Sequence, residues 1–231
     1  MYFNEAYGGD KIMRKVEPIR ELEKIKEVKN VLLKRGFRDY MLFIIGINTG
    51  LRIGDILKLR VKDVKDKTYI NLKEQKTSKE KKFKINQDLK KEIDRYTDKM
   101  EEDEFLFQSS KGINKPISRV QAHRILKSAA EEVGLKNISN HSMRKTFGYF
   151  YYKKYKEISY LQKIFNHSSP GVTLDYIGVN QDVIDETIDN FYLWLYFKRK
   201  YIERYKLKIG VLPYKWSISF IDLKFQQIYP Q

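Results

Sequence analysis

The chain has 231 residues and a formal net charge of +16, which favours a polyanionic partner because clustered Lys and Arg side chains release counterions from nucleic acid. The absence of cysteine excludes disulfides, thiolate metal sites and cysteine nucleophiles, and it fits a protein of the reducing cytoplasm. The sequence shows neither the apolar core of a signal peptide nor an uncharged apolar run of the ~20 residues that a membrane span needs.

Apolar spacing predicts three helices in the first sixty residues. Over residues 19–33 apolar side chains recur at helical spacing among Lys and Glu. The segment at about 38–48 is apolar on nearly all sides, so it is expected to be a buried helix. Gly50 suits the left-handed conformation that ends a helix, and a short helix is expected at roughly 54–59.

Residues 61–85 change to the alternation of polar and apolar side chains that is typical of a strand. The two alternating runs are 68–72 and 82–85, and they flank a basic segment at 76–81. This pattern predicts a small antiparallel sheet over about 62–85 with an exposed, positively charged turn.

Helical patterning resumes after Asn86, a residue suited to the N-cap position, and the chain from here is predicted to be helical. Gly134 is expected to end the predicted helix at about 118–133. The helix that follows Asn86 is succeeded by predicted helices at about 118–133, 141–154, 158–166, 169–177 and 181–191. The expected fold class is therefore mainly α (α+β) with a small β insert.

The patterning divides the chain into three parts. Residues 1–17 lack periodicity and are expected to be a flexible lead-in. Residues 18–193 carry the predicted helices and strands and are expected to form one domain. Residues 194–231 contain eight Lys or Arg against two acidic residues, and they form a basic, aromatic extension to which the patterning assigns no fold or role.

Three residues on predicted helix starts suit the binding of a phosphate. Arg52 opens a helix beside backbone N–H groups that attract anions, although an arginine there is commonly just solvated. His141 and Arg144 are three positions apart, so on a helix they share a face and can address one ligand. An equally ordinary interpretation is that His141 and Arg144 form a surface pair without a function.

Three further residues have ordinary structural explanations when each is taken alone. Lys76 lies in the basic turn, where solubility accounts for it. His167 lies at a helix end, where a structural histidine is the usual reading. Tyr176 is one of 17 tyrosines, and core packing is the usual role for any of them.

Taken together, in this order and spacing, the six residues resemble the catalytic domain of the tyrosine recombinase (phage integrase) family. The family pattern is an arginine in a TGLR-like box, a lysine in a β-hairpin, H-x-x-R, a His or Trp, and a nucleophilic tyrosine. The chain supplies TGLRIGDILKLRVKDV, a KTSK turn and HSMR; His167 follows Arg144 by 23 residues and Tyr176 follows by nine more. The resemblance covers about residues 18–193 and implies a helical catalytic domain with the sheet as an insert.

The resemblance implies how the phosphodiester is held and attacked. Arg52 and Arg144 would bind its oxygens, which suits guanidinium groups because they stay charged and bind two oxygens at once. Tyr176 would attack phosphorus and form a 3′-phosphotyrosine that conserves the bond for religation. Replacing Arg144 by Lys is predicted to remove most cleavage while the chain folds normally.

The resemblance also implies how protons move. Lys76 would give a proton to the leaving 5′-hydroxyl as a general acid. His141 would assist proton transfer at the attacking oxygen, and His167 would hydrogen-bond the phosphate or support the site. Such chemistry needs no metal and no other cofactor, so none is expected.

Double-stranded DNA is the partner that both the charge and the resemblance indicate. His123, in the basic helix at 118–133, is interpreted as a surface residue near DNA. In the family a helix after the tyrosine docks on a neighbouring subunit of a tetrameric synapse, and 182–191 is a candidate for it. The basic residues expected to contact DNA are Lys79, Arg119, Arg124, Lys127 and Lys145.

One departure from the family pattern keeps the functional reading open. About 17 residues precede the first predicted helix, whereas family members carry an N-terminal core-binding domain that closes a clamp around DNA. We therefore expect weakened DNA binding or a partner protein that supplies the core-binding function. The favoured function is a site-specific recombinase or integrase of a mobile element. The alternatives are a DNA relaxase of type IB topoisomerase character and a catalytically idle DNA-binding relative.

Overall fold

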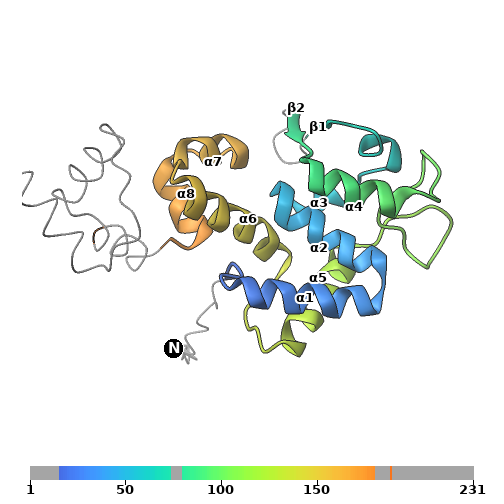
Figure 1. Ribbon diagram of the computed structural model, residues 1–231, viewed down its shortest axis with the longest axis horizontal. Helices are drawn as coiled ribbons and strands as arrows, with labels where there is room; N and C mark the ends of the chain where they lie inside the picture. Colours follow the sequence, from blue (N-terminus) through green and yellow to red (C-terminus); the bar gives the residue numbers. More distant parts are fainter. Residues whose placement is uncertain (1–15, 74–79, 180–187, 189–231) are drawn as a thin grey trace, which may run out of the picture. The chain divides into compact units, whose positions relative to one another are not determined.

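A computed structural model describes residues 16–73, 80–179 and 188 of the chain, and the first two segments belong to one compact unit. This part is mainly helical with a small antiparallel sheet, which confirms the predicted fold class (Figure 1). Its elements are α1 (Leu22–Arg35), α2 (Phe37–Thr49), α3 (Ile53–Ile56), the 3-10 turn η1 (Val61–Asp63), β1 (Tyr69–Lys73), β2 (Glu80–Lys84), α4 (Gln87–Thr97), α5 (Arg119–Glu132), α6 (Asn140–Tyr155), α7 (Ile158–Phe165) and α8 (Pro170–Ile177).

Helix α2 is the buried centre of this fold, as its apolar sequence predicts. Met41, Leu42 and Ile45 are fully buried, and α2 packs against α1, α3, α4 and α6 (Figure 1). A side chain at Gly46 would collide with Met143 of α6, so the absence of a Cβ lets the two helices approach closely. The position of α6, which carries two of the candidate residues, is therefore set by α2.

Helix α1 starts later than the sequence predicts. Ile19 was expected to open the helix, but it is buried before the helix begins, and its backbone N–H donates to Oγ1 of Thr146 at 2.8 Å. The N–H of Glu17 likewise donates to the Asn137 carbonyl at 3.3 Å. These bonds hold the preceding segment against the start of α6, and Leu22 is left 68% exposed at the first position of α1.

The predicted sheet is present as β1 paired antiparallel with β2. Ile70 stands opposite Phe83, and both side chains contribute to the main core. The connecting residues 74–79 lie outside the described part of the chain, and with them the predicted basic turn that contains Lys76 and Lys79.

Serine and asparagine side chains begin most of the later helices. Asn86 accepts a hydrogen bond from the Leu89 N–H at 2.8 Å, which confirms it as the N-cap of α4. Ser118, Ser139 and Ser169 cap α5, α6 and α8 in the same way. The predicted lead-in up to residue 15, the helix at 181–191 apart from residue 188, and the extension at 194–231 lie outside the described residues.

Helix α6 lies between two hydrophobic clusters. Its Met143 belongs to the large core built by α1 to α5, whereas Phe147 packs on the small cluster formed by Leu161, Phe165 and Ile177 of α7 and α8. Figure 1 shows α6, α7 and α8 together, from olive to orange. The small cluster positions α8, the helix that carries Tyr176, against α6.

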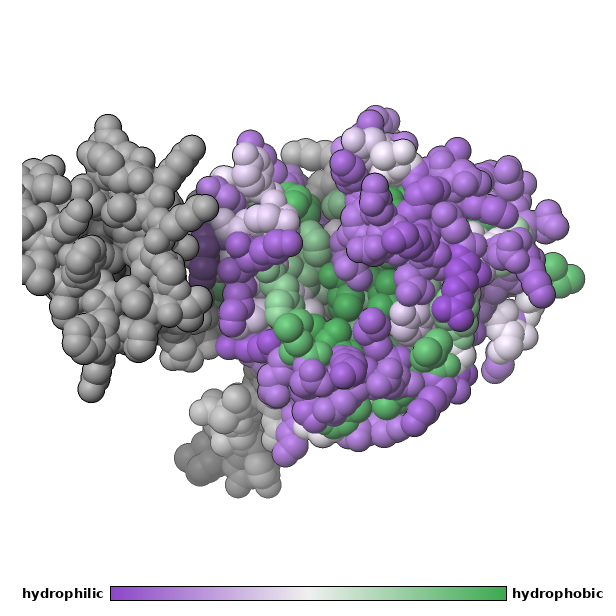
Figure 2. Space-filling view, viewed as in Figure 1, coloured by the Kyte–Doolittle hydropathy of each residue, from purple (hydrophilic) through white to green (hydrophobic). Residues whose placement is uncertain are grey.

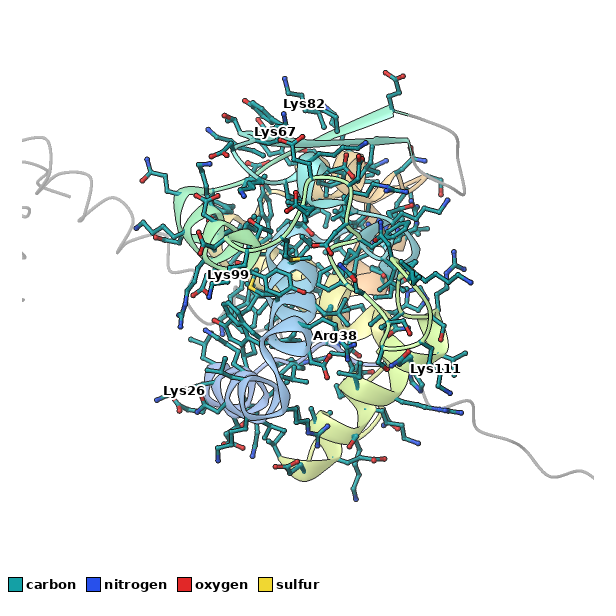
Figure 3. The ribbon with its side chains drawn as sticks, turned by 90° about the vertical axis from the view of Figure 1, so that its right-hand side faces the viewer. Lys26, Arg38, Lys67, Lys82, Lys99 and Lys111 are labelled. Atoms are coloured by element: carbon teal, nitrogen blue, oxygen red, sulfur yellow. The ribbon has the colours of Figure 1, made fainter. Side chains whose placement is uncertain are left out.

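Charged residues cover most of the surface of the described part. Figure 2 shows hydrophilic residues over most of one face, with apolar residues visible between them. The labelled lysines in Figure 3 extend outward from different parts of the chain; they are Lys26, Lys67, Lys82, Lys99 and Lys111. Positive charge alone therefore does not single out one binding face. Within the described ranges, no helix combines the length and the apolar character required to cross a membrane.

Gly148 provides a test of how tightly α8 packs on α6. A Cβ at this position would lie 2.5 Å from Cγ2 of Ile177 and 2.8 Å from Cε2 of Phe165. We expect Gly148→Ala to lower the free energy of unfolding by about 1–2 kcal/mol, because overpacking outweighs the gain in helix propensity. Gly171→Ala, in open space on α8, is the control and should not destabilise the chain. Equal urea midpoints for the two variants would contradict the tight packing.

Candidate active site

Arg144 is the anchor of the site. Its side chain is on α6 and is only 3% exposed. Nη1 donates to the Gly50 carbonyl, Nη2 donates to the Phe165 carbonyl at 3.0 Å, and the guanidinium carbon lies 4.3 Å from the centre of the Phe165 ring. Arg144 therefore joins the end of α2 to the end of α7.

The backbone of Gly50 explains why the TGLR segment carries a glycine there. Gly50 has φ 63° and ψ 19°, the left-handed conformation that the sequence predicts for the end of α2. A Cβ at this position would also collide with the Phe147 ring. The glycine thus ends α2 and allows α6 to approach closely enough for Arg144 to reach the Gly50 carbonyl.

Tyr176 lies on α8 among aromatic and cationic groups. Its ring meets those of Phe165 and His167 edge to face, at centroid distances of 5.5 and 5.0 Å. Arg144 is hydrogen-bonded to its side chain. Nζ of Lys145 lies 5.1 Å from the centre of the ring. The structure thus brings Arg144, His167 and Tyr176 together.

Two arginines act on the acidity of this tyrosine. Burial raises the pKa of the Tyr176 hydroxyl above its usual 10.0, whereas the charge of Arg144, its hydrogen bond and the charge of Arg52 lower it. The net direction is upward, so Tyr176 is a neutral phenol near pH 7. Arg52 and Arg144 are therefore the two cations whose charge offsets the effect of burial on this hydroxyl.

His167 lies in the turn between α7 and α8, with Nδ1 3.1 Å from Oγ1 of Thr173. The hydroxyl of Thr173 donates to the Ser169 carbonyl at 3.2 Å. Since a hydroxyl has one proton to donate, Thr173 accepts from His167, which assigns a proton to Nδ1. In the neutral ring Nε2 is then an acceptor.

Lys145 is placed differently from the other cations that the sequence singles out as DNA contacts. Its side chain is only 6% exposed, and it lies behind the Tyr176 ring and not among the exposed cations. The spacing of polar residues along α6 did not predict this burial, because α6 packs against both hydrophobic clusters. Few positions of a helix that packs between two clusters face solvent. Because Lys145 is buried and lies against the Tyr176 ring, we count it among the residues of the site.

Arg52 and His141 line a cavity beside this cluster. Arg52 is the N-cap residue of α3, and His141 is exposed in the first turn of α6. The cavity has a volume of about 520 Å³ and lies where the starts of α3, α5 and α6 meet. Its described lining residues are Arg52, Ile53, Gly54, Asp55, Arg119, Ser139, Asn140, His123 and His141.

Helix α5 contributes both cavity-lining and exposed basic residues. Arg119 lines the cavity, as does His123, which the sequence indicated only as a surface residue near DNA. Their spacing of four positions already places them on one helical face. Arg124 and Lys127 are exposed, and Lys127 lies 3.7 Å from Glu131. The remaining sequence candidates, Lys76 and Lys79, lie outside the described residues.

Comparison with known proteins agrees with this geometry. The model of the phage integrase family matches residues 20–182. The probable integrase/recombinase YoeC of Bacillus subtilis is 54% identical over 170 residues, covering 74% of this chain and 93% of that protein. The chain therefore belongs to the phage integrase family.

Solved structures show the same fold at lower identity. A crystal structure of XerA recombinase has a TM-score of 0.63 and 19% identity, with 76% of this chain covered. A structure of the Tn1549 transposon integrase with transposon right end DNA has a TM-score of 0.59 and 18% identity, with 72% of this chain covered. The chain spans 66% and 63% of the lengths of the two chains in those structures.

The carbonyl contacts of Arg144 change what we expect of Arg144→Lys. The sequence alone predicted normal folding, but one ammonium cannot reproduce the two carbonyl bonds of the guanidinium fork. We expect the free energy of unfolding to fall by about 1–3 kcal/mol, because a buried acceptor loses its donor. The control is Arg124→Lys on the exposed side of α5, which should change it by less than about 0.5 kcal/mol. Indistinguishable urea unfolding curves for the two variants would argue against this structural role.

The environment of Tyr176 predicts its titration. In a difference titration between the unsubstituted chain and Tyr176→Phe, followed by tyrosinate absorbance, Tyr176 should ionise above its usual pKa of about 10. Arg52→Ala should move this pKa further upward, because the charge of Arg52 lowers it. Arg124→Ala is the control and should leave it unchanged. An unchanged Tyr176 pKa in Arg52→Ala would show that the two groups do not interact.

Proposed function

We propose that the chain is a site-specific DNA recombinase or integrase that breaks and rejoins double-stranded DNA with Tyr176 as the nucleophile. The observation that carries this proposal is the cluster in which the Tyr176 ring lies against His167 and Lys145, beside the buried Arg144, in a member of the phage integrase family. The 54% identity with a probable integrase/recombinase supports it. So does the likeness of fold to an integrase solved with transposon DNA.

The proposed first step exchanges one phosphate ester for another. The oxygen of Tyr176 attacks phosphorus, the bond to the 5′-oxygen breaks, and the 3′-phosphate remains on the tyrosine. Attack by a 5′-hydroxyl reverses these steps and restores the DNA strand. Arg52 and Arg144 stabilise the negative charge that develops on the phosphate oxygens.

Proton transfer must accompany the attack because the raised pKa keeps Tyr176 as a phenol. We assign the removal of this proton to His141, which lines the cavity together with Arg52. His167 supports the Tyr176 ring, and in its neutral form Nε2 is a hydrogen-bond acceptor. The proton for the leaving 5′-oxygen is assigned to Lys76, which lies outside the described residues.

The proposal extends to the partners of the reaction. Recombination joins two duplexes, so several copies of the chain, up to a tetrameric synapse, would act on paired sites. A partner protein that supplies a core-binding function is also part of this proposal. The net charge of +16 favours such DNA binding, and the proposed location is the cytoplasm.

A nicked suicide DNA tests the nucleophile, because the nick lets the cleaved 5′ fragment diffuse away and traps the covalent intermediate. We expect an adduct that survives SDS with the unsubstituted chain and at least a 10³-fold loss, on the order of that for other nucleophile deletions, with Tyr176→Phe. The matched control is Tyr160→Phe, at a tyrosine 55% exposed on α7, which should retain the adduct.

Each other outcome selects a different function. An adduct that persists in Tyr176→Phe would assign the nucleophile to another residue. Absence of adduct with every DNA offered would favour the idle DNA-binding relative. Relaxation of supercoiled DNA that carries a single site, without exchange between paired sites, would favour the type IB topoisomerase-like relaxase.

A further inference from the structure

The segment at 17–20, just before α1, connects α6 to the end of α8. The Glu17 N–H donates to the Asn137 carbonyl at 3.3 Å, shortly before α6 begins. The Ile19 N–H donates to Oγ1 of Thr146, within α6, at 2.8 Å. Two hydrogen bonds from the backbone therefore give this segment a fixed place beside α6.

Arg20 makes the contact between this segment and α8. Its Nη2 donates to the Gly178 carbonyl at 3.0 Å and to Oε2 of Glu17 at 3.0 Å. Its guanidinium carbon also lies 5.6 Å from the centre of the Tyr149 ring on α6. Gly178 is the C-cap residue of α8 and follows Tyr176 by two positions. One side chain therefore joins the end of the tyrosine-bearing helix to α6 and to the segment before α1.

The backbone at Gly178 lies close against the segment before α1. A Cβ at Gly178 would be 2.9 Å from Nη2 of Arg20, 3.5 Å from Cδ of Pro18 and 3.6 Å from Oε2 of Glu17. The φ of 71° at Gly178 is also one that favours glycine. The end of α8 thus combines a glycine conformation with the close approach of three neighbouring side chains.

Helix α8 is short, so the position of Tyr176 depends on the contacts at its end. The helix has eight residues, and Ile177 packs it onto the small cluster with Leu161 and Phe165. Apolar contacts of this kind have no preferred direction. A hydrogen bond does have one, so the bond to the Gly178 carbonyl restricts how the last turn of α8 can rotate or slide.

We propose that Arg20 is a positioning residue for Tyr176 and acts on it through the Gly178 carbonyl. For its effect on the reaction, this inference rests on the proposed function. Arg20 holds α8 where the Tyr176 ring lies against His167, beside Arg144. Attack on phosphorus requires the tyrosine oxygen at a defined distance and direction, and a displacement of about 1 Å can slow a reaction about 100-fold.

The first measurement follows Tyr176 in the absence of DNA. The chain is labelled with fluorotyrosine, and the fluorine NMR signal of Tyr176 is the one that Tyr176→Phe removes. Arg20→Met should shift or broaden this signal. The chain should stay folded, because ion pairs as exposed as that of Arg20 contribute little to stability. The matched control is Arg35→Met, at an equally exposed arginine that pairs with Glu132 between α1 and α5, and it should leave the Tyr176 signal unchanged.

The second measurement is the rate of adduct formation on the suicide DNA. Arg20→Met should lower this rate about 10- to 100-fold, whereas the affinity for DNA and its salt dependence should not change. Glu17→Ala should lower the rate by less, because Arg20 loses the carboxylate that orients it. The double variant should be no slower than Arg20→Met, since both changes act on one contact. Arg35→Met should keep the full rate.

The outcomes separate this inference from the function on which it rests. A changed Tyr176 signal with a slower reaction at equal DNA affinity supports it. If the unsubstituted chain forms an adduct and Arg20→Met leaves either the signal or the rate unchanged, the inference is wrong and the proposed function stands. A loss of rate matched by a loss of DNA affinity would also overturn it, because Arg20 would then be a DNA contact. If the unsubstituted chain forms no adduct, the proposed function fails, and the fluorine signal still decides whether Arg20 holds Tyr176 in place.

Discussion

The buried guanidinium of Arg144 is the interaction on which the site depends. A charge that is 3% exposed is costly unless it is hydrogen-bonded, and Arg144 meets this requirement with the carbonyls of Gly50 and Phe165. These carbonyls end α2 and α7, so one side chain of α6 sets the positions of both helix ends. Arg52 follows the first end and His167 follows the second. Loss of Arg144 would therefore disturb the arrangement of the site as well as its charge.

Close helix packing makes these contacts possible. Gly46 lets α6 approach α2 at Met143, and Gly148 lets α7 and α8 approach α6 on its other side. Because α6 is covered on both sides, even Lys145 is buried and lies at the Tyr176 ring. Tyr176 is consequently held in a low-dielectric environment that opposes its ionisation, with Arg144 and Arg52 as the opposing positive charges.

Charge and geometry locate the site together, and neither does so alone. Lysines point outward from several elements, so the net charge of +16 favours a polyanion without indicating where it binds (Figure 3). The cavity at the starts of α3, α5 and α6 indicates one candidate binding face, since Arg52, Arg119 and His123 all line it. Arg52 lines this cavity, and its charge also lowers the pKa of Tyr176.

Within the described part of the chain, the sequence by itself determined the order of the main helices and strands, the cap residues Asn86 and Gly50, and the family. These features are local, because strand alternation, helical spacing and capping each depend on residues that are close together in the sequence. Only the tertiary structure decided that Arg144 bonds the carbonyl of Gly50, 94 positions away, and that His123 shares a cavity with Arg52. It also decided that Lys145 is buried. The reason is that burial and long-range contacts follow from how helices pack, and the period of a helix does not specify which neighbours cover each of its sides.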